Sequence, residues 1–405
     1  MTERPVIIGR PWRRRMEARD PAERHRVASS LELFFDLCFV VAVGADAARL
    51  EHALAEGRVL WGVAGFLLIF AAINWAWLNY TWFASAYDTD DTYFRSATMM
   101  VMAGALVLAA GVPRAFDHRD LKIMAVGYAI MRLGLESQRL RAAAGDPEHR
   151  TTMLRFVTGE GGCAVYWLAV AFAAPRSWQP WLIAAGIAAE LLVPPWAESA
   201  GRTTWHPHHI TERYGLLTII VLGETVLSST NAVRDALSGD ASLRLYTVAA
   251  GGLVTVFGMW WVYFSMSSAG LLTDLRTSIL WGYGHYVIYA SGAAVGAGIA
   301  VNAALATHEA HISSATAGLS LTVPVFCYLL VVWWLLVRPH GEDAPYAWGM
   351  PVIGLAAIAT SWSGHAVALT GVLMALQIVL SIWAHGTKGS RPSAARSRNG
   401  GAAPR

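Results

Sequence analysis

Residues Ser30 to Asp46 read SLELFFDLCFVVAVGAD, an apolar run that carries three carboxylates. At about 100° per residue in an α-helix, Asp36 lies about 40° from Glu32 and Asp46 about 40° to the other side, so the three acids share one stripe. Such a stripe cannot face lipid, because a carboxylate in a membrane interior costs several kcal/mol unless it is paired, hydrated or protonated. The run predicts a membrane helix that turns its acids toward other helices.

The composition of the whole chain points to the same setting. Of its 405 residues, 55% are hydrophobic and 15% are charged, and the mean hydropathy is +0.41. This balance is typical of a membrane protein, so the lipid bilayer is its first expected partner. Basic residues lie in the tails and short loops and not on one soluble face, so we expect no nucleic-acid partner. The three cysteines lie in apolar stretches, which argues against a disulfide framework.

Twelve apolar windows, each about 20 residues long, are candidates for membrane helices. An even number of spans puts both termini on one side, and the excess of Arg and Lys in the tails and alternate loops predicts that this side is the cytoplasm. No short apolar region with a small-residue cleavage site follows the N-terminus, so we expect no removed signal peptide. The sequence thus predicts an all-α, multi-pass protein of the bacterial inner membrane. The windows are Leu31–Leu50, Val59–Ala84, Ser96–Val112, Leu121–Leu140, Met153–Ala174, Trp178–Val193, Ile210–Asn231, Leu245–Ser268, Ser278–Ala303, Ser313–Val337, Ala347–Trp362 and Gly364–Trp383.

The two halves of the chain resemble weak copies of one another, offset by about 180 residues. The second window ends in an aromatic cluster, Trp75 to Phe83, and the eighth ends in another, Trp260 to Phe264. Because six helices separate the copies, they would insert in the same orientation, which predicts two parallel six-helix repeats. The predicted organisation is a basic cytoplasmic N-terminal segment (1–28), a first repeat (29–207), a second repeat (208–385) and a disordered cytoplasmic tail (386–405).

A second apolar segment with charges reads TERYGLLTIIVLGE from Thr211 to Glu224. Glu224 lies deep in this segment, and Arg213 shares its helix face about 16 Å away along the axis. Glu212 and Arg213 fit either an interfacial ion pair or a gate. His285, about two turns into the ninth window, fits either a proton relay or a hydrogen-bond partner of a carboxylate.

Structural roles are open for several of these side chains. Glu32 fits a helix cap, Asp36 a bond to a neighbouring helix, and Asp46 a site near the outer headgroups. Arg132 and Glu136 are four residues apart on one predicted helix, and we expect them to neutralise one another. Three acids between Asp88 and Asp91, on the predicted cytoplasmic face, are a further candidate feature. The candidates for transport or an ion pathway are Glu32, Asp36, Asp46, Glu212, Arg213, Glu224 and His285.

The sequence shows few signs of metal binding or catalysis. The stretch Trp205 to His209 reads WHPHH, but its spacing matches no usual zinc site and no cysteine or acid pattern completes it. We therefore expect no metal and no cofactor. The chain has no Ser-His-Asp series, Walker loop or His-Glu-x-x-His helix, so we do not expect an enzyme.

Two motifs resemble the low temperature requirement A (LtrA) family. Its members begin with L-E-L-F-F-D-L-x-F-V, which matches Leu31 to Val40, and later carry E-R-x-G-L-x-T-I-I-x-L-G-E, which matches Glu212 to Glu224. The resemblance in layout covers Ser29 to His385. It implies an all-helical membrane fold and a link to growth in the cold, and no particular activity. The start of the first helix is also similar to that of lysosomal-type potassium channels built from two parallel six-helix repeats, although Phe35 replaces their serine.

Acids deep in apolar helices favour a secondary transporter or a cation or proton pathway centred on Asp36 and Glu224, with His285 assisting. The rival hypothesis is a non-transporting membrane factor that acts on lipids or partner proteins in the cold. The partners expected for transport are a monovalent cation or a small molecule. Substrate, coupling ion, channel or carrier type and oligomeric state stay open, because they depend on how the helices pack.

Overall fold

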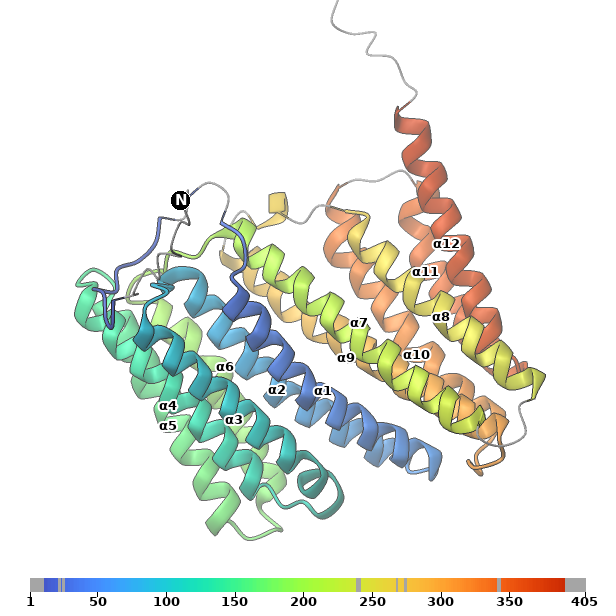
Figure 1. The fold of residues 1–405 in the computed structure, drawn as a ribbon, viewed down its shortest axis with the longest axis horizontal. Coiled ribbons are helices and arrows are strands. Elements are labelled where there is room, and N and C mark those ends of the chain that lie inside the picture. The colour runs from blue at the N-terminus through green and yellow to red at the C-terminus, as the bar shows by residue number, and fades with distance from the viewer. Residues whose placement is uncertain are drawn as a thin grey trace, which may run out of the picture.

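The computed structural model describes residues 11–20, 23, 26–237, 242–266, 269–272, 275–340 and 344–389. In these ranges the chain folds into twelve α-helices joined by loops and short 3-10 or π turns, with no strand (Figure 1). The helices are α1 (Ser30–Ala55), α2 (Val59–Tyr87), α3 (Thr92–His118), α4 (Lys122–Gly145), α5 (Arg150–Ala173), α6 (Gln179–Glu198), α7 (Pro207–Leu237), α8 (Leu243–Phe264), α9 (Leu275–Ala306), α10 (Ser314–Val332), α11 (Ala344–Ala359) and α12 (Ala366–Gly389).

Each predicted window corresponds to one of these helices. The all-helical prediction is confirmed, and the chain is a multi-pass membrane protein. Among the described residues, nine helices are long and apolar enough to cross a membrane. The exceptions are α1 and α4, which carry several charged residues each, and α11, which is short. The prediction of twelve spans is therefore met for nine helices.

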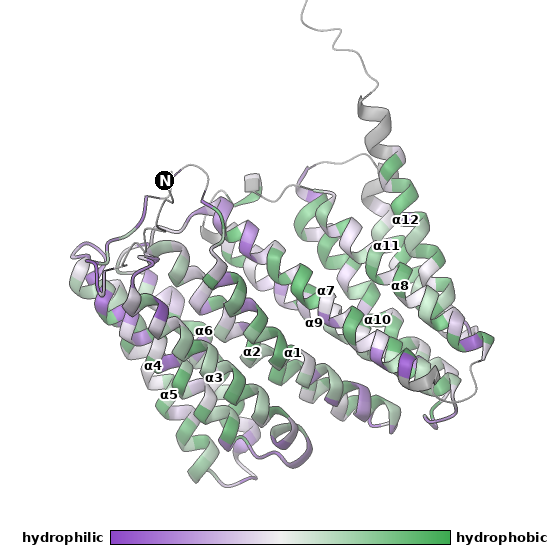
Figure 2. Ribbon diagram, viewed as in Figure 1, coloured by the Kyte–Doolittle hydropathy of each residue, from purple (hydrophilic) through white to green (hydrophobic). Residues whose placement is uncertain are grey.

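The helices turn apolar side chains outward and charged side chains inward. On α1, Phe34, Leu37 and Val41 are half exposed, whereas Glu32 and Asp36 on the opposite stripe are at most 2% exposed. Figure 2 shows apolar residues along the middle of the helices and more polar ones near the helix ends. This pattern is the reverse of a soluble helix and suits a lipid surround, because lipid rewards apolar contact and penalises charge. The predicted acid stripe of α1 is thus confirmed.

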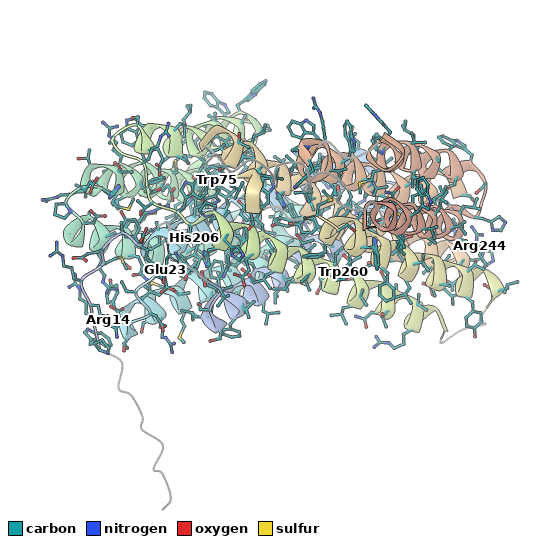
Figure 3. All side chains as sticks on the ribbon, turned by 90° about the horizontal axis from the view of Figure 1, so that it is seen from above. Arg14, Glu23, Trp75, His206, Arg244 and Trp260 are labelled. Carbon is teal, nitrogen blue, oxygen red and sulfur yellow. The ribbon has the colours of Figure 1, made fainter. Side chains whose placement is uncertain are left out.

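The helices form two neighbouring groups, α1–α6 and α7–α12 (Figures 1 and 3). In each group the first helix packs on the third and the third on the fourth, as α1·α3·α4 and α7·α9·α10. The α3–α4 contact is close because Gly104 and Gly127 face one another, and a Cβ on Gly127 would lie 2.4 Å from the backbone nitrogen of Leu108. Small residues of this kind allow membrane helices to pack without a hydrophobic driving force.

The two groups meet mainly through α1 and α2 on one side and α7 and α9 on the other. The beginning of α1 and the end of α12 lie on the same side of the molecule (Figure 1). The helix α12 extends to Gly389, and the remainder of the predicted tail lies outside the described residues.

Residues 11–20 of the N-terminal segment pack against the ends of α2, α3 and α4. Asp91 caps α3 by accepting from Phe94 N at 2.8 Å, pairs with Arg141, and also accepts from Arg14 N at 2.7 Å. Burial opposes ionisation of Asp91, but the hydrogen bond from Arg141 and those from backbone N–H groups outweigh it and lower the pKa of this carboxyl. At least this acid of the Asp88 to Asp91 loop therefore has a structural role.

Candidate functional site

The most buried charge pair between the two groups joins α1 to α7. Arg213 Nη2 donates to Asp36 Oδ1 at 2.6 Å, and both side chains are fully buried. Trp77 of α2 donates from its ring nitrogen to the same oxygen at 2.7 Å. The other oxygen, Asp36 Oδ2, is buried and has no hydrogen-bond partner among the described residues. Two donors therefore share one carboxylate oxygen, and the second stays bare.

Glu32 lies one turn earlier on α1 and belongs to the same cluster. It closes a capping box with Ser29, whose backbone N–H donates to Glu32 Oε2 at 2.8 Å, so the structural role considered from the sequence is confirmed. His209 Nε2 lies 3.2 Å from Glu32 Oε1, and Arg213 Nη1 lies 3.7 Å from it. We call Glu32, Asp36, Trp77, His209 and Arg213 the interface cluster.

The sequence of the WHPHH stretch explains how His209 reaches this position. His206 donates from Nε2 to the carbonyl of Glu23 at 2.7 Å, which leaves Nδ1 to accept from His209 N at 3.2 Å (Figure 3 labels His206 and Glu23). His206 thus caps α7, and Pro207 fills the first helical position, where a missing N–H costs nothing. These histidines have helix-capping and ion-pairing partners, and no group suited to a metal ion occurs in the described part of the chain.

Glu212 does not pair with its neighbour Arg213. Its carboxylate accepts from the backbone N–H of Ala28 at 3.1 Å, just before α1 begins. The interfacial Glu212–Arg213 pair considered from the sequence therefore does not form, because Arg213 points to Asp36 and Glu212 to the chain before α1. Each ties α7 to α1 by a separate contact.

Asp46 and Glu224 lie further along the same interface. Asp46 is fully buried, and neither of its oxygens has a hydrogen-bond partner within the described ranges. Glu224 accepts from Ser228 at 3.3 Å and packs against α1 at Gly44, where a Cβ would lie 2.5 Å from Glu224 Oε1. Gly44 is eight residues beyond Asp36, or about 12 Å along the helix. Asp36 and Glu224 therefore lie at two levels of one interface and do not form a single centre.

His285 lies apart from the acids, inside an aromatic layer. Its Nδ1 is 2.8 Å from the carbonyl of Trp281, and Tyr263 OH is 2.9 Å from Nε2. A carbonyl only accepts, so Nδ1 carries the hydrogen and Nε2 accepts from the tyrosine. Tyr214 lies between, because its ring contacts His285 on one side and Trp77 of the interface cluster on the other. The structure thus does not bring His285 to Asp36.

A second buried charge cluster lies within the first group of helices. Arg132 pairs with Glu160 of α5 and Glu190 of α6, and Arg139 pairs with Glu136 and Glu160. The expectation that Arg132 and Glu136 neutralise one another is wrong, because each forms its ion pair with another residue. Glu160 and Glu190 are visible in the sequence as acids inside apolar windows, but helical spacing gives no sign of partners on other helices.

The chemistry open to the interface cluster follows from its charges. Two carboxylates face one guanidinium, and His209 provides a second, titratable base. With His209 neutral, the side chains of the cluster sum to one negative charge in a region shielded from water, and the buried Arg26 guanidinium also attracts Glu32. The excess of acid within the cluster favours uptake of a proton or a small cation. Trp77 and His209 were absent from the candidates predicted from the sequence. The position of His209, one turn before Arg213 on the same helix face, is the signal that could have identified it.

Comparison with known proteins identifies a family and one similar protein. A family model described as bacterial low temperature requirement A protein (LtrA) matches residues 27–384. An uncharacterized protein of Rhizobium meliloti (strain 1021) is 29% identical over 245 residues, and the match spans 58% of this chain and 58% of that protein. The matched region of the family model includes all of the interface cluster.

Proposed function

The chain belongs to the bacterial LtrA family, and we propose that it is an inner-membrane protein that moves protons or a monovalent cation through the junction between its two helix groups. The observation that carries this proposal is the interface cluster, where Asp36 and Glu32 face a single guanidinium, that of Arg213. A bare buried carboxylate oxygen costs free energy that a proton or cation would recover. The family's description names a low temperature requirement, and a link to growth in the cold is part of this proposal.

The path we propose runs along α1 from the interface cluster to the level of Asp46 and Glu224. Asp46 is a second buried carboxylate without a partner among the described residues, ten residues and about 15 Å beyond Asp36. Both levels line the same contact of α1 with α7 and α9. Acids at two depths of one interface suit stepwise transfer of a positive charge, since one site near each side allows both loading and release.

The predicted two-repeat architecture is also part of the proposal. The residue pairs Glu32–His209 and Asp36–Arg213 are each 177 residues apart, as are the first residues of α1 and α7, Ser30 and Pro207. Contacts between positions of equal offset are expected where two parallel repeats meet on a pseudo-twofold axis along the membrane normal. Matching helix pairs in the two groups agree with this arrangement. On this view the interface cluster lies on the axis.

The orientation we propose has both ends of the chain in the cytoplasm. The end of the molecule that carries the start of α1 also holds the basic residues Arg14, Arg15, Arg19 and Arg26. Positive residues concentrate on the cytoplasmic side of membrane proteins. The interface cluster then lies nearer the cytoplasm, and Asp46 with Glu224 lies nearer the outside.

The test is ion flux into proteoliposomes that hold the full-length protein. Potassium, sodium and proton fluxes are measured for the wild type, Asp36→Asn and Glu224→Gln, with equal folding checked by gel filtration and circular dichroism. We expect flux of one of these ions in the wild type and its fall to the level of protein-free liposomes in Asp36→Asn, because an amide cannot take up the charge.

Glu148→Gln is the matched control, since it removes a carboxylate from an exposed loop on the same chain. It should conduct like the wild type. A well-folded Asp36→Asn protein with undiminished flux would sink the proposal. Absence of any flux of the three ions from the wild type would favour the rival function, a membrane factor that acts on lipids or partner proteins.

A further inference from the structure

The buried charge cluster of α4, α5 and α6 contains more acid than base. Glu136, Glu160 and Glu190 face the guanidinium groups of Arg132 and Arg139, and all five side chains are almost fully buried. In a membrane interior an excess charge of this kind is costly, so a neutral cluster is strongly favoured. One bound positive charge would make it neutral.

The hydrogen-bond donors are unevenly distributed among the three acids. Glu190 accepts from Trp75 at 2.8 Å, Tyr128 at 2.5 Å, Arg132 at 3.1 Å and Trp167 at 3.2 Å, which satisfies both of its oxygens as a carboxylate (Trp75 is labelled in Figure 3). The positive charge that would neutralise the cluster is therefore not expected to bind at Glu190.

Glu136 and Glu160 are held together by one nitrogen. Arg139 Nη1 donates to Glu136 Oε1 at 2.9 Å and to Glu160 Oε2 at 2.5 Å, and Arg132 Nη1 also donates to Glu160 Oε2. The remaining oxygens, Glu136 Oε2 and Glu160 Oε1, are buried without a donor among the described residues. The two carboxyl groups are therefore neighbours around Arg139 Nη1. The guanidinium groups of Arg132 and Arg139 balance only two of the three carboxylates of the cluster, so one acid of this neighbouring pair is favoured to bind a proton.

We propose that Glu136 and Glu160 share one proton and form a proton-binding site in the first helix group, separate from the interface cluster. The proton bonds to Oε2 of Glu136, because the Glu136 carboxyl group accepts one hydrogen bond and that of Glu160 accepts two. The resulting O–H donates to Glu160 Oε1. Binding adds one proton and removes one negative charge, so the cluster becomes neutral. A metal cation fits less well, since the arginine nitrogens already occupy the facing oxygens and the described residues contain no group suited to a metal ion.

The route for the proton is a cavity that reaches the pair through Arg139, which lines the cavity and pairs with both acids. It has a volume of about 90 Å³ and is lined by Arg139 and Glu198 among the aromatic side chains of Trp82, Phe156 and Trp205. One water needs about 10–15 Å³, so the cavity has room for several waters. Its lining includes residues from the ends of α2 and α6. The end of α2 is hydrogen-bonded to the N-terminal segment through Arg19 N and the carbonyl of Ala86, which puts the cavity on the side we propose to be cytoplasmic.

Protonation of the pair depends on every charged or titratable group around it. Arg139 bridges the pair to the cavity, and Arg132 links it to Glu190, so the site is coupled to both. The groups that face the site are Tyr128, Arg132 and Arg139 from α4, Cys163 from α5, Glu190 and Glu198 from α6, and Tyr283 from α9.

Infrared difference spectroscopy on the full-length protein in liposomes tests the proposal without reference to transport. The spectra of Glu136→Gln and Glu160→Gln are each compared with the wild type. Both variants should lose one carboxylic-acid C=O band and keep their carboxylate bands, because removing either acid leaves two carboxylates for two arginines and no need for a proton. In the wild type this band should shift in D2O, since the cavity admits water.

Two control variants separate this site from its surroundings. Glu198→Gln removes the other acid of the cavity, and Asp36→Asn alters the interface cluster; both should retain the band. Loss of a carboxylate band instead of an acid band in Glu136→Gln would overturn the proposal. If Glu136→Gln does not fold, the comparison of the wild type with Glu160→Gln decides. The wild type should show an acid band that shifts in D2O, and Glu160→Gln should lack it. A wild type without this band, or a Glu160→Gln variant that keeps it, would overturn the proposal. Failure of the flux test leaves this result unaffected.

Discussion

At the scale of single residues, the interface cluster depends on how donors are shared. Arg213 and Trp77 both donate to Asp36 Oδ1, while no described residue donates to Asp36 Oδ2. A buried ion pair of this kind contributes little net stability, since desolvation opposes the attraction, but loss of one partner leaves an uncompensated charge. The stability of the pair and its ability to take up a proton thus come from the same buried carboxylate.

Arg213→Gln should destabilise the protein by about 3–5 kcal/mol, because Asp36 and Glu32 would then lose their guanidinium. In the double variant with Asp36→Asn, the loss should be smaller than the sum of the two single losses by about 0.5–3 kcal/mol. Denaturant unfolding of the full chain in detergent measures all four states of this cycle. Strictly additive losses would show that the two side chains do not interact.

At the scale of helices and loops, the sequence predicts where helices form and which of their faces is polar better than it predicts which side chains pair. The windows locate all twelve helices because hydrophobic length is a local property of the chain. The acid stripe of α1 is likewise predicted, since it follows from helical periodicity alone. The partners of those acids could not be predicted, because Arg213 is 177 residues from Asp36 and only helix packing brings them together. For the same reason helical spacing pairs Arg132 with Glu136 on its own helix, whereas in the structure its partners are Glu160 and Glu190.

The close contact of α3 with α4 allows a test of helix packing. Gly127→Ala should destabilise the protein by about 1–3 kcal/mol, because its Cβ would meet the Leu108 backbone and the helices must separate. Gly161→Ala on α5 is the matched control, since no atom lies within 4 Å of an added Cβ there. It should be neutral or gain up to about 1 kcal/mol from helix propensity. Thermal unfolding of both variants gives the comparison, and equal effects would contradict the packing argument.

The loop between α2 and α3 should make stability depend on pH. Burial, reinforced by Glu32, raises the pKa of Asp88 to about 6, even though Arg26 opposes the shift. A raised pKa in the folded state stabilises the protonated form, so this contribution is present below about pH 4, the unfolded value, and is lost as the pH rises through 6. Asp88→Asn cannot titrate. Its melting temperature should match the wild type below pH 4 and exceed it above pH 6; the same difference at both pH values would exclude Asp88 as the cause.

At the scale of the whole molecule, buried charge is concentrated at contacts between different helices. The first helix group contains its own network of arginines and glutamates, and the junction of the groups contains the interface cluster. The lipid-facing surface, in contrast, presents apolar side chains such as Phe34 and Val41 of α1. Burying charge in a membrane protein costs least where neighbouring helices provide partners, so these two clusters mark places where the fold depends on polar contacts.

The charge pattern across the junction also restricts which chains can assemble. At the 177-residue offset, α1 contributes the acids Glu32 and Asp36, and α7 contributes the bases His209 and Arg213. Two copies of α1 brought together in the same way would set acid against acid, and two copies of α7 would set base against base. Charge repulsion therefore disfavours pairing of two identical halves, and charge attraction favours pairing of the two different halves. A single chain that contains both halves supplies them in equal number.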